Sequence, residues 1–177
     1  GSYAGTIVMG LRKASLYGKV AVTPCVFDNV KYTNIFSANI FTVQPASDLG
    51  TSGVDGTQYL LGNYGSTSVW KGTITGTSFV GVTCANLALS QTLMTGLQTM
   101  STPPSSLTQK NAVKVAGDDG RMNQVTLSAS TLYFTRAVAT GTGTTSGVAY
   151  FAIDKTTNAI KKQGILGFAG WSVWNGA

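Results

Sequence analysis

The sequence predicts an all-β single domain, either a sandwich or a jelly-roll-like barrel, with one short helix. Turn-forming residues recur about every ten residues, and apolar and polar residues alternate between them, which is typical of half-buried strands. The chain also has no Glu and no His, and only 10% of its residues are charged. Exposed helix faces normally carry Glu, Lys and Arg, so this composition beside many Thr and Ser residues favours sheet.

Two hairpins and several further strands follow from the alternation. The first hairpin is predicted over 69–84, with its turn at Gly76 and with Lys71 facing water. The second runs from Val113 to Leu127 around an Asp-Gly turn, since these residues supply the positive φ of a tight turn. Other strands are expected at Thr6 to Met9, Lys19 to Phe27, Val30 to Val43, Gln58 to Leu61, Thr131 to Val138, Val148 to Ile153 and Ile160 to Trp174.

The remaining elements are a helix, a loop and a turn. The helix is predicted between Asn86 and Met100, because leucines recur there at four-residue spacing and Pro103 forbids continuation. Gly and Thr alternate from Gly141 to Gly147, which predicts a flexible loop, and Asp154 to Asn158 reads as a turn.

The chain shows no convincing repeat or linker, so it is read as one unit. Residues 1–17 are interpreted as an N-terminal extension or a first strand that neighbouring subunits could exchange. Residues 18–177 are interpreted as the β domain.

Side chains for catalysis and metal binding are scarce. Without histidine there is no Ser-His-Asp or Cys-His mechanism, and two cysteines alone cannot complete a tetrahedral zinc site. No glycine loop of the nucleotide-binding type is present. All six acids lie where turns are expected: Asp28, Asp48, Asp55, Asp118, Asp119 and Asp154. The prediction is a protein that is not an enzyme and has no catalytic residue, metal or cofactor.

Cys25 and Cys84 each lie at the end of a predicted strand, and no third cysteine competes for them. A lone pair in a polar, exported β protein most often forms one cystine, so a disulfide between them is predicted. Two buried free thiols in a virion protein assembled inside a cell are the alternative.

Aromatic residues gather near the end of the chain at Phe168, Trp171 and Trp174. Such residues are more often core or subunit interface, so an interface is preferred here. With Tyr150 they could also form an aromatic shelf for a sugar. The sequence contains no run of about 18 apolar residues, so no membrane span is expected.

The net charge of +6 is spread along the chain, with small clusters at Arg12-Lys13 and Lys161-Lys162. A weak contact with nucleic acid or another polyanion is therefore an expectation, without base specificity. The alternative is that a few positive charges keep a nearly neutral surface soluble.

The segment from Tyr3 to Leu11 carries the apolar residues Ile7, Val8, Met9 and Leu11. Left unpaired, such a strand would expose a row of free N–H and C=O groups, so it is interpreted as an assembly strand. The following stretch Tyr17-Gly18-Lys19-Val20-Ala21-Val22-Thr23-Pro24-Cys25-Val26 resembles the first core strand of donor-strand-exchanged pilus subunits. The resemblance implies that the preceding segment completes the sheet of a neighbouring subunit.

These features together predict a non-enzymatic structural subunit of an extracellular or cell-surface filament, a pilus-like polymer whose partners are copies of itself. A weakly charged, Thr/Ser/Gly-rich β fold suits an exposed polymer that meets changing salt. A viral or phage capsid or decoration protein, located in the virion, is the first alternative. A carbohydrate-binding module is the second.

Overall fold

The computed structural model describes residues 7–11, 17–19, 21, 24–27, 40–49, 56–76, 87–104, 106–108, 114–116, 120–141, 143–168 and 172. These residues form an almost wholly β fold, as the sequence predicts. The strands are β1 (Val8–Gly10), β2 (Cys25–Phe27), β3 (Phe41–Asp48), β4 (Thr57–Asn63), β5 (Val69–Thr75), β6 (Ala88–Met94), β7 (Ser106–Thr108), β8 (Lys114–Ala116), β9 (Met122–Ser128), β10 (Thr131–Thr140), β11 (Thr145–Asp154) and β12 (Ile160–Leu166).

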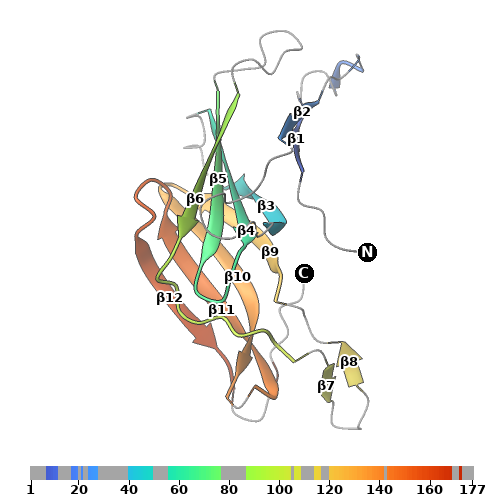
Figure 1. Cartoon of the computed structure of the whole chain (residues 1–177), viewed down its shortest axis with the longest axis vertical. Coiled ribbons are helices and arrows are strands. Elements are labelled where there is room, and N and C mark those ends of the chain that lie inside the picture. The colour runs from blue at the N-terminus through green and yellow to red at the C-terminus, as the bar shows by residue number, and fades with distance from the viewer. Residues whose placement is uncertain are drawn as a thin grey trace.

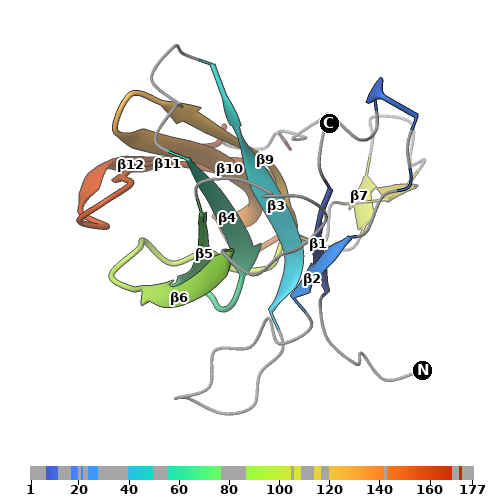
Figure 2. The ribbon, with the colours of Figure 1, turned by 90° about the horizontal axis from the view of Figure 1, so that it is seen from above.

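Eight strands form one curled sheet in the order β12-β11-β10-β9-β3-β4-β5-β6 (Figure 1). Seen from above, the sheet is an arc with β12 toward one end and β6 toward the other (Figure 2). The neighbours are antiparallel except β3 and β9, which pair in parallel through Ala46↔Val125. That parallel pair joins the two antiparallel halves of the sheet.

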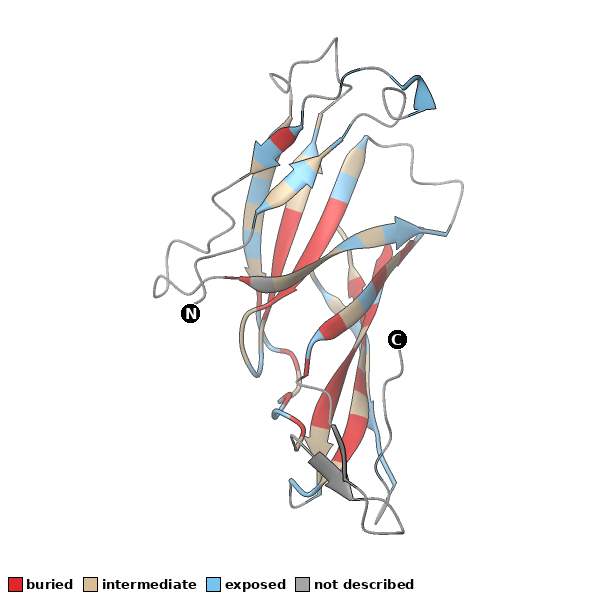
Figure 3. Cartoon of the chain, turned by 90° about the vertical axis from the view of Figure 1, so that its right-hand side faces the viewer, coloured by how far each residue is buried: buried red, intermediate tan, exposed pale blue. Residues whose placement is uncertain are grey.

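The main core lies on the inner face of the arc. Alternate residues of each strand point into it, as the two-residue repeat of a strand requires. Phe134 and Phe151 stack there with their ring centroids 4.7 Å apart. Leu61 and Val69 from the other half of the sheet belong to the same cluster. Burial is concentrated along the strands of the large sheet (Figure 3).

A second, smaller cluster lies on the other face of the β3–β6 half. Its centre is Trp70, which is 0% exposed and packs with Ile40 and Leu60. A Cβ added at Gly72 would lie 2.4 Å from the Trp70 ring. Because Gly72 has no side chain, the Trp70 indole can lie directly against the strand at this position.

The predicted helix between Asn86 and Met100 is wrong. Residues 88–94 form strand β6, which pairs with β5 from Thr75↔Ala88 to Val69↔Met94. Gly96, with φ +77°, follows the strand. The segment after it bridges the β4–β5 turn and β10, because Met100 N donates to Ser66 O (2.6 Å) and Ala139 N donates to Ser101 O (2.9 Å).

Both predicted hairpins have the wrong partners. Strand β5 lies between β4 and β6. The predicted return strand at 80–84 lies outside the described residues. Strand β9 lies between β10 and β3, and β8 pairs with β7. Within the second hairpin, Val113 and the turn residues 117–119 lie outside the described residues.

The strands predicted at 58–61, 131–138 and 148–153 are confirmed as parts of β4, β10 and β11. The turn after Asp154 is also confirmed, with Asn158 N donating to Asp154 O at 3.0 Å. The predicted loop from Gly141 to Gly147 is shorter, since β11 already begins at Thr145. Only the end of the predicted Lys19 to Phe27 strand is seen as β2, and β12 ends at Leu166, before the predicted Trp174.

Candidate assembly surface and buried lysine cluster

The predicted assembly strand pairs within its own chain. Strands β1 and β2 form a separate two-stranded sheet, with Val8 opposite Phe27 and Gly10 opposite Cys25. This hairpin lies to the right of the large sheet in Figure 1 and in Figure 2. The Val8 side chain packs against the Trp70 cluster and so connects the hairpin to the large sheet.

The other apolar side chains of β1 and its flanks are exposed. Met9 is 64% exposed, and Ile7 and Leu11 are exposed beside it. Met9 lies opposite Val26 of β2, which is exposed as well. Because side chains alternate along a strand, Val8 faces the protein while Ile7, Met9 and Leu11 form an exposed apolar row.

A groove of about 400 Å³ runs along the inner side of this hairpin. Strand β1 forms one wall of the groove, and Val43 and Leu60 lie in the other. Gln58 is the one polar side chain among the described residues of its lining. The N-terminal strand is therefore seated against the sheet without completely filling the space beside it.

A second apolar surface lies at the end of β12, an edge strand of the large sheet. Phe168 is 67% exposed, and Ile165 and Leu166 are exposed next to it. The predicted interface residues Trp171 and Trp174 lie outside the described residues. Tyr150 lies against Gly164 in the middle of β12, because a Cβ added at Gly164 would be 2.5 Å from the Tyr150 hydroxyl oxygen.

Cys25 is buried, with 1% of its surface exposed, at the start of β2. Cys84 lies outside the described residues. The disulfide between them stays a prediction.

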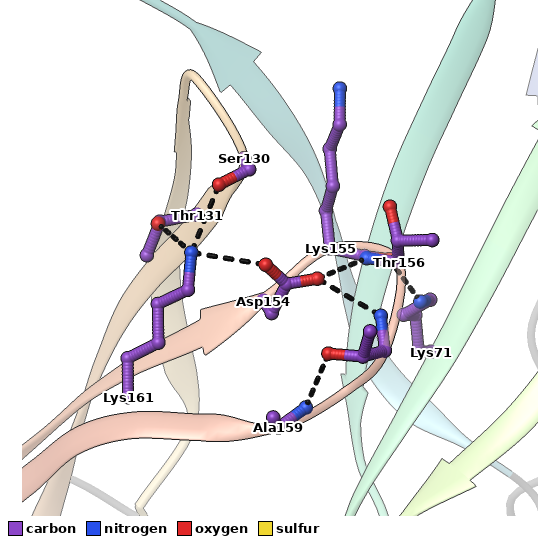
Figure 4. A network of polar contacts seen from close by, with 9 residues as sticks. Lys71, Ser130, Thr131, Asp154, Lys155, Thr156, Ala159 and Lys161 are labelled. Carbon is purple, nitrogen blue, oxygen red and sulfur yellow. Dashed lines mark hydrogen bonds and ion pairs between the residues drawn. The ribbon is translucent and has the colours of Figure 1, made fainter.

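A polar cluster joins the β11–β12 turn to the rest of the fold (Figure 4). Asp154 Oδ1 accepts hydrogen bonds from the backbone N–H groups of Thr156 (3.0 Å) and Thr157 (2.9 Å). Its Oδ2 lies 3.0 Å from Lys161 Nζ, which also donates to Ser130 Oγ at 2.9 Å. These contacts hold the pKa of Asp154 well below its ordinary value. The hydrogen bond from the Thr157 backbone has the largest effect, and the one from Lys161 the next largest.

Lys71 enters this cluster from β5, on the opposite half of the arc. The prediction that it faces water is wrong, since it is only 6% exposed. Its Nζ donates to Lys155 O (2.5 Å) and to Asn158 Oδ1 (2.6 Å), and lies 5.7 Å from the centroid of the Tyr59 ring. Burial lowers the pKa of Lys71, against the opposing attraction of Asp154.

The sequence signals located only part of these sites. Among the predicted basic clusters, Arg12-Lys13 lies outside the described residues, and Lys161 is held by Asp154. Lys162 lines a shallow groove of about 390 Å³ on the outer face with Tyr133 and Tyr150. The buried lysine cluster was missed because its members are far apart in the sequence and meet only through the curl of the sheet.

No group of three or more Cys, Asp, Glu or His side chains among the described residues could hold a metal ion. None of the described segments forms a helix with the length and apolar character needed to cross a bilayer. Comparisons with protein-family models, with curated proteins and with solved structures found no match to this chain.

Replacing Asp154 by Ala is expected to destabilise the protein at neutral pH, because the turn loses two hydrogen bonds and the ion pair to Lys161. Since the pKa of Asp154 is lower in the folded than in the unfolded state, the carboxylate stabilises the fold above the unfolded pKa of about 3.9. That contribution is lost as the pH falls toward the folded pKa.

Urea unfolding at a series of pH values measures this effect. The difference in unfolding free energy between wild type and D154A should be constant above about pH 5 and should shrink below about pH 4. L49A is the control, because Leu49 is exposed and does not titrate, and its difference from wild type should not change with pH. A D154A difference that does not change between pH 7 and pH 2 would contradict the expected role.

Proposed function

We propose that this chain is a non-enzymatic structural subunit of an extracellular filament. Copies of the chain join head to tail, with the β1–β2 hairpin of one copy seated on the β12 edge of the next. One observation carries this proposal: exposed apolar side chains gather at the hairpin and at the end of β12. These two strand systems lie on opposite sides of the molecule in both Figure 1 and Figure 2.

The position of the two surfaces favours a polymer. When two different surfaces of one subunit bind each other, the contact is heterologous, and it repeats indefinitely unless the rotation closes a ring. The hairpin offers Ile7, Met9 and Leu11, while the β12 end offers Leu166 and Phe168. Burying a side chain of this size completely stabilises a contact by about 1.5 to 3 kcal/mol.

Backbone pairing supports the same arrangement. In the part of the chain that the structure describes, β12 is an edge of the large sheet and β1 pairs with β2 alone. Among the described residues, neither strand has a partner on its other side, and strand addition between copies would satisfy the N–H and C=O groups there. Lys161 and Lys162 occupy the first part of β12, so the pairing is expected along its apolar second part.

The experiment uses two complementary variants. I7S/M9S removes apolar side chains from the hairpin, and I165S/L166S removes them from β12. Each variant alone is expected to stay monomeric, because one of its two surfaces is lost. An equimolar mixture is expected to form a 1:1 complex that grows no further, since the intact hairpin of one variant meets the intact β12 of the other.

Light scattering and negative-stain microscopy read out the result. L49S is the matched control, because Leu49 is 75% exposed but belongs to neither surface, and it should polymerise like wild type. Variants that polymerise normally would refute the proposed contacts. Closed shells of the wild-type protein, in place of filaments, would favour the capsid alternative.

A further inference from the structure

We propose that Lys71 and Asn158 form a covalent amide cross-link between their side chains, made by the protein itself without a cofactor. This inference is independent of the proposed filament, because it rests only on the buried cluster. It starts from the contact between an amine and a carboxamide, the two groups that such a bond needs. Lys71 Nζ lies 2.6 Å from Asn158 Oδ1.

The reacting atoms are within range of one another. A carbonyl bond is about 1.23 Å long, so Lys71 Nζ is no more than about 3.8 Å from Asn158 Cγ. Groups held near 3 to 3.5 Å in a fixed orientation react far faster than free groups. Only a small shift brings the amine from the oxygen to the carbon.

The surroundings hold both groups in place. The Lys71 amine is fixed by a second hydrogen bond to Lys155 O and lies beside the Tyr59 ring. Asn158 has a φ of +60°, and its N–H donates to Asp154 O at 3.0 Å, which fixes the end of the turn. The side chains therefore meet in a defined geometry.

Burial also favours the reactive form of the lysine. Only the neutral amine is a nucleophile, and desolvation lowers the pKa of Lys71. Its 6% exposure restricts the access of water, which would otherwise compete for the carboxamide carbon.

The chemistry balances without an oxidant or another reactant. The Lys71 Nζ lone pair forms a bond to Asn158 Cγ, and the Cγ–Nδ2 bond breaks with its electron pair leaving on Nδ2. One proton passes from Nζ to Nδ2, so that ammonia leaves and a secondary amide remains. The product joins β5 to the β11–β12 turn, across the opening of the curled sheet.

Intact mass spectrometry of the full chain under denaturing conditions tests the cross-link. The wild-type mass is expected to be lower than the sequence mass by one ammonia, beyond any loss that a disulfide causes. Tandem spectra of a digest are expected to contain a branched peptide that joins Lys71 to Asn158. K71R and N158G should each abolish the loss of ammonia completely, and Gly suits the positive φ at residue 158.

K155Q is the matched control, because Lys155 also lies beside Tyr59 but offers only its backbone carbonyl to Lys71, and it should keep the loss. Closure of Asn158 onto its own backbone would also release ammonia, but that loss would persist in K71R. A wild-type protein with its full sequence mass, or a loss that K71R retains, would overturn the proposal.

Discussion

Deleting residues 1–11 is expected to abolish polymer formation and to leave a folded monomer. The deletion removes β1 and its exposed apolar residues, but the eight-stranded sheet keeps every one of its strands. Among the described residues that the deletion removes, Val8 contributes most to the fold, because it packs partly buried against the Trp70 cluster. Removing it should cost about 1 to 2 kcal/mol of unfolding free energy.

Analytical ultracentrifugation and circular dichroism separate the outcomes. A monomer with the strand signal of the wild type would support the role of β1 in assembly. A deletion variant that unfolds would show that β1 is an ordinary first strand of its own domain, and one that still forms the native polymer would refute the assignment. A shorter deletion of residues 1–6, which keeps β1, should polymerise normally.

Trp70→Ala is expected to lower the unfolding free energy by about 3 to 5 kcal/mol, because it removes the largest side chain of the Trp70 cluster and leaves a cavity. The indole is completely buried against Ile40 and Leu60, and its Nε1 donates to Gln91 Oε1 at 3.1 Å. The replacement therefore also leaves the Gln91 side chain without its indole donor.

Denaturant unfolding followed by fluorescence or circular dichroism gives the magnitude. Trp70→Phe is the graded control, and it should cost less because it keeps most of the buried ring while losing the bond to Gln91. Leu49→Ala, at an exposed position, should change the unfolding free energy by no more than about 0.5 kcal/mol. If Trp70→Ala lowered the unfolding free energy by less than about 1 kcal/mol, the Trp70 cluster would not be important for stability.

The helix prediction failed for a reason that lies in the spacing itself. Leu89 and Leu93 are four residues apart, a separation that puts side chains on one face of a helix and equally on one face of a strand. The structure uses the second option, with Leu89 against the Trp70 cluster and Met94 in the main core. The contacts with β5 decide between two conformations that the local pattern does not distinguish.

Alternation along β5 does not decide whether Lys71 is exposed. Its neighbour Trp70 is apolar and neighbouring residues point to opposite faces of a strand. In a sheet with one buried and one solvent-exposed face, Lys71 would therefore lie on the exposed face. The sheet curls, however, and both faces of β5 are covered near Lys71. Val69 lies in the main core and Trp70 in the Trp70 cluster. The long side chain then carries its ammonium to the carbonyl groups of a turn far away in the sequence.

The sequence by itself determined the β class, the strands at 58–61, 131–138 and 148–153, and the turn after Asp154. These features depend on side-chain alternation and turn chemistry over a few residues, which the local sequence contains in full. Strand partners, the parallel β3–β9 junction and the meeting of Lys71 with Asn158 were decided only by the tertiary structure. They depend on how the sheet curls, and curvature is a property of all its strands packed together.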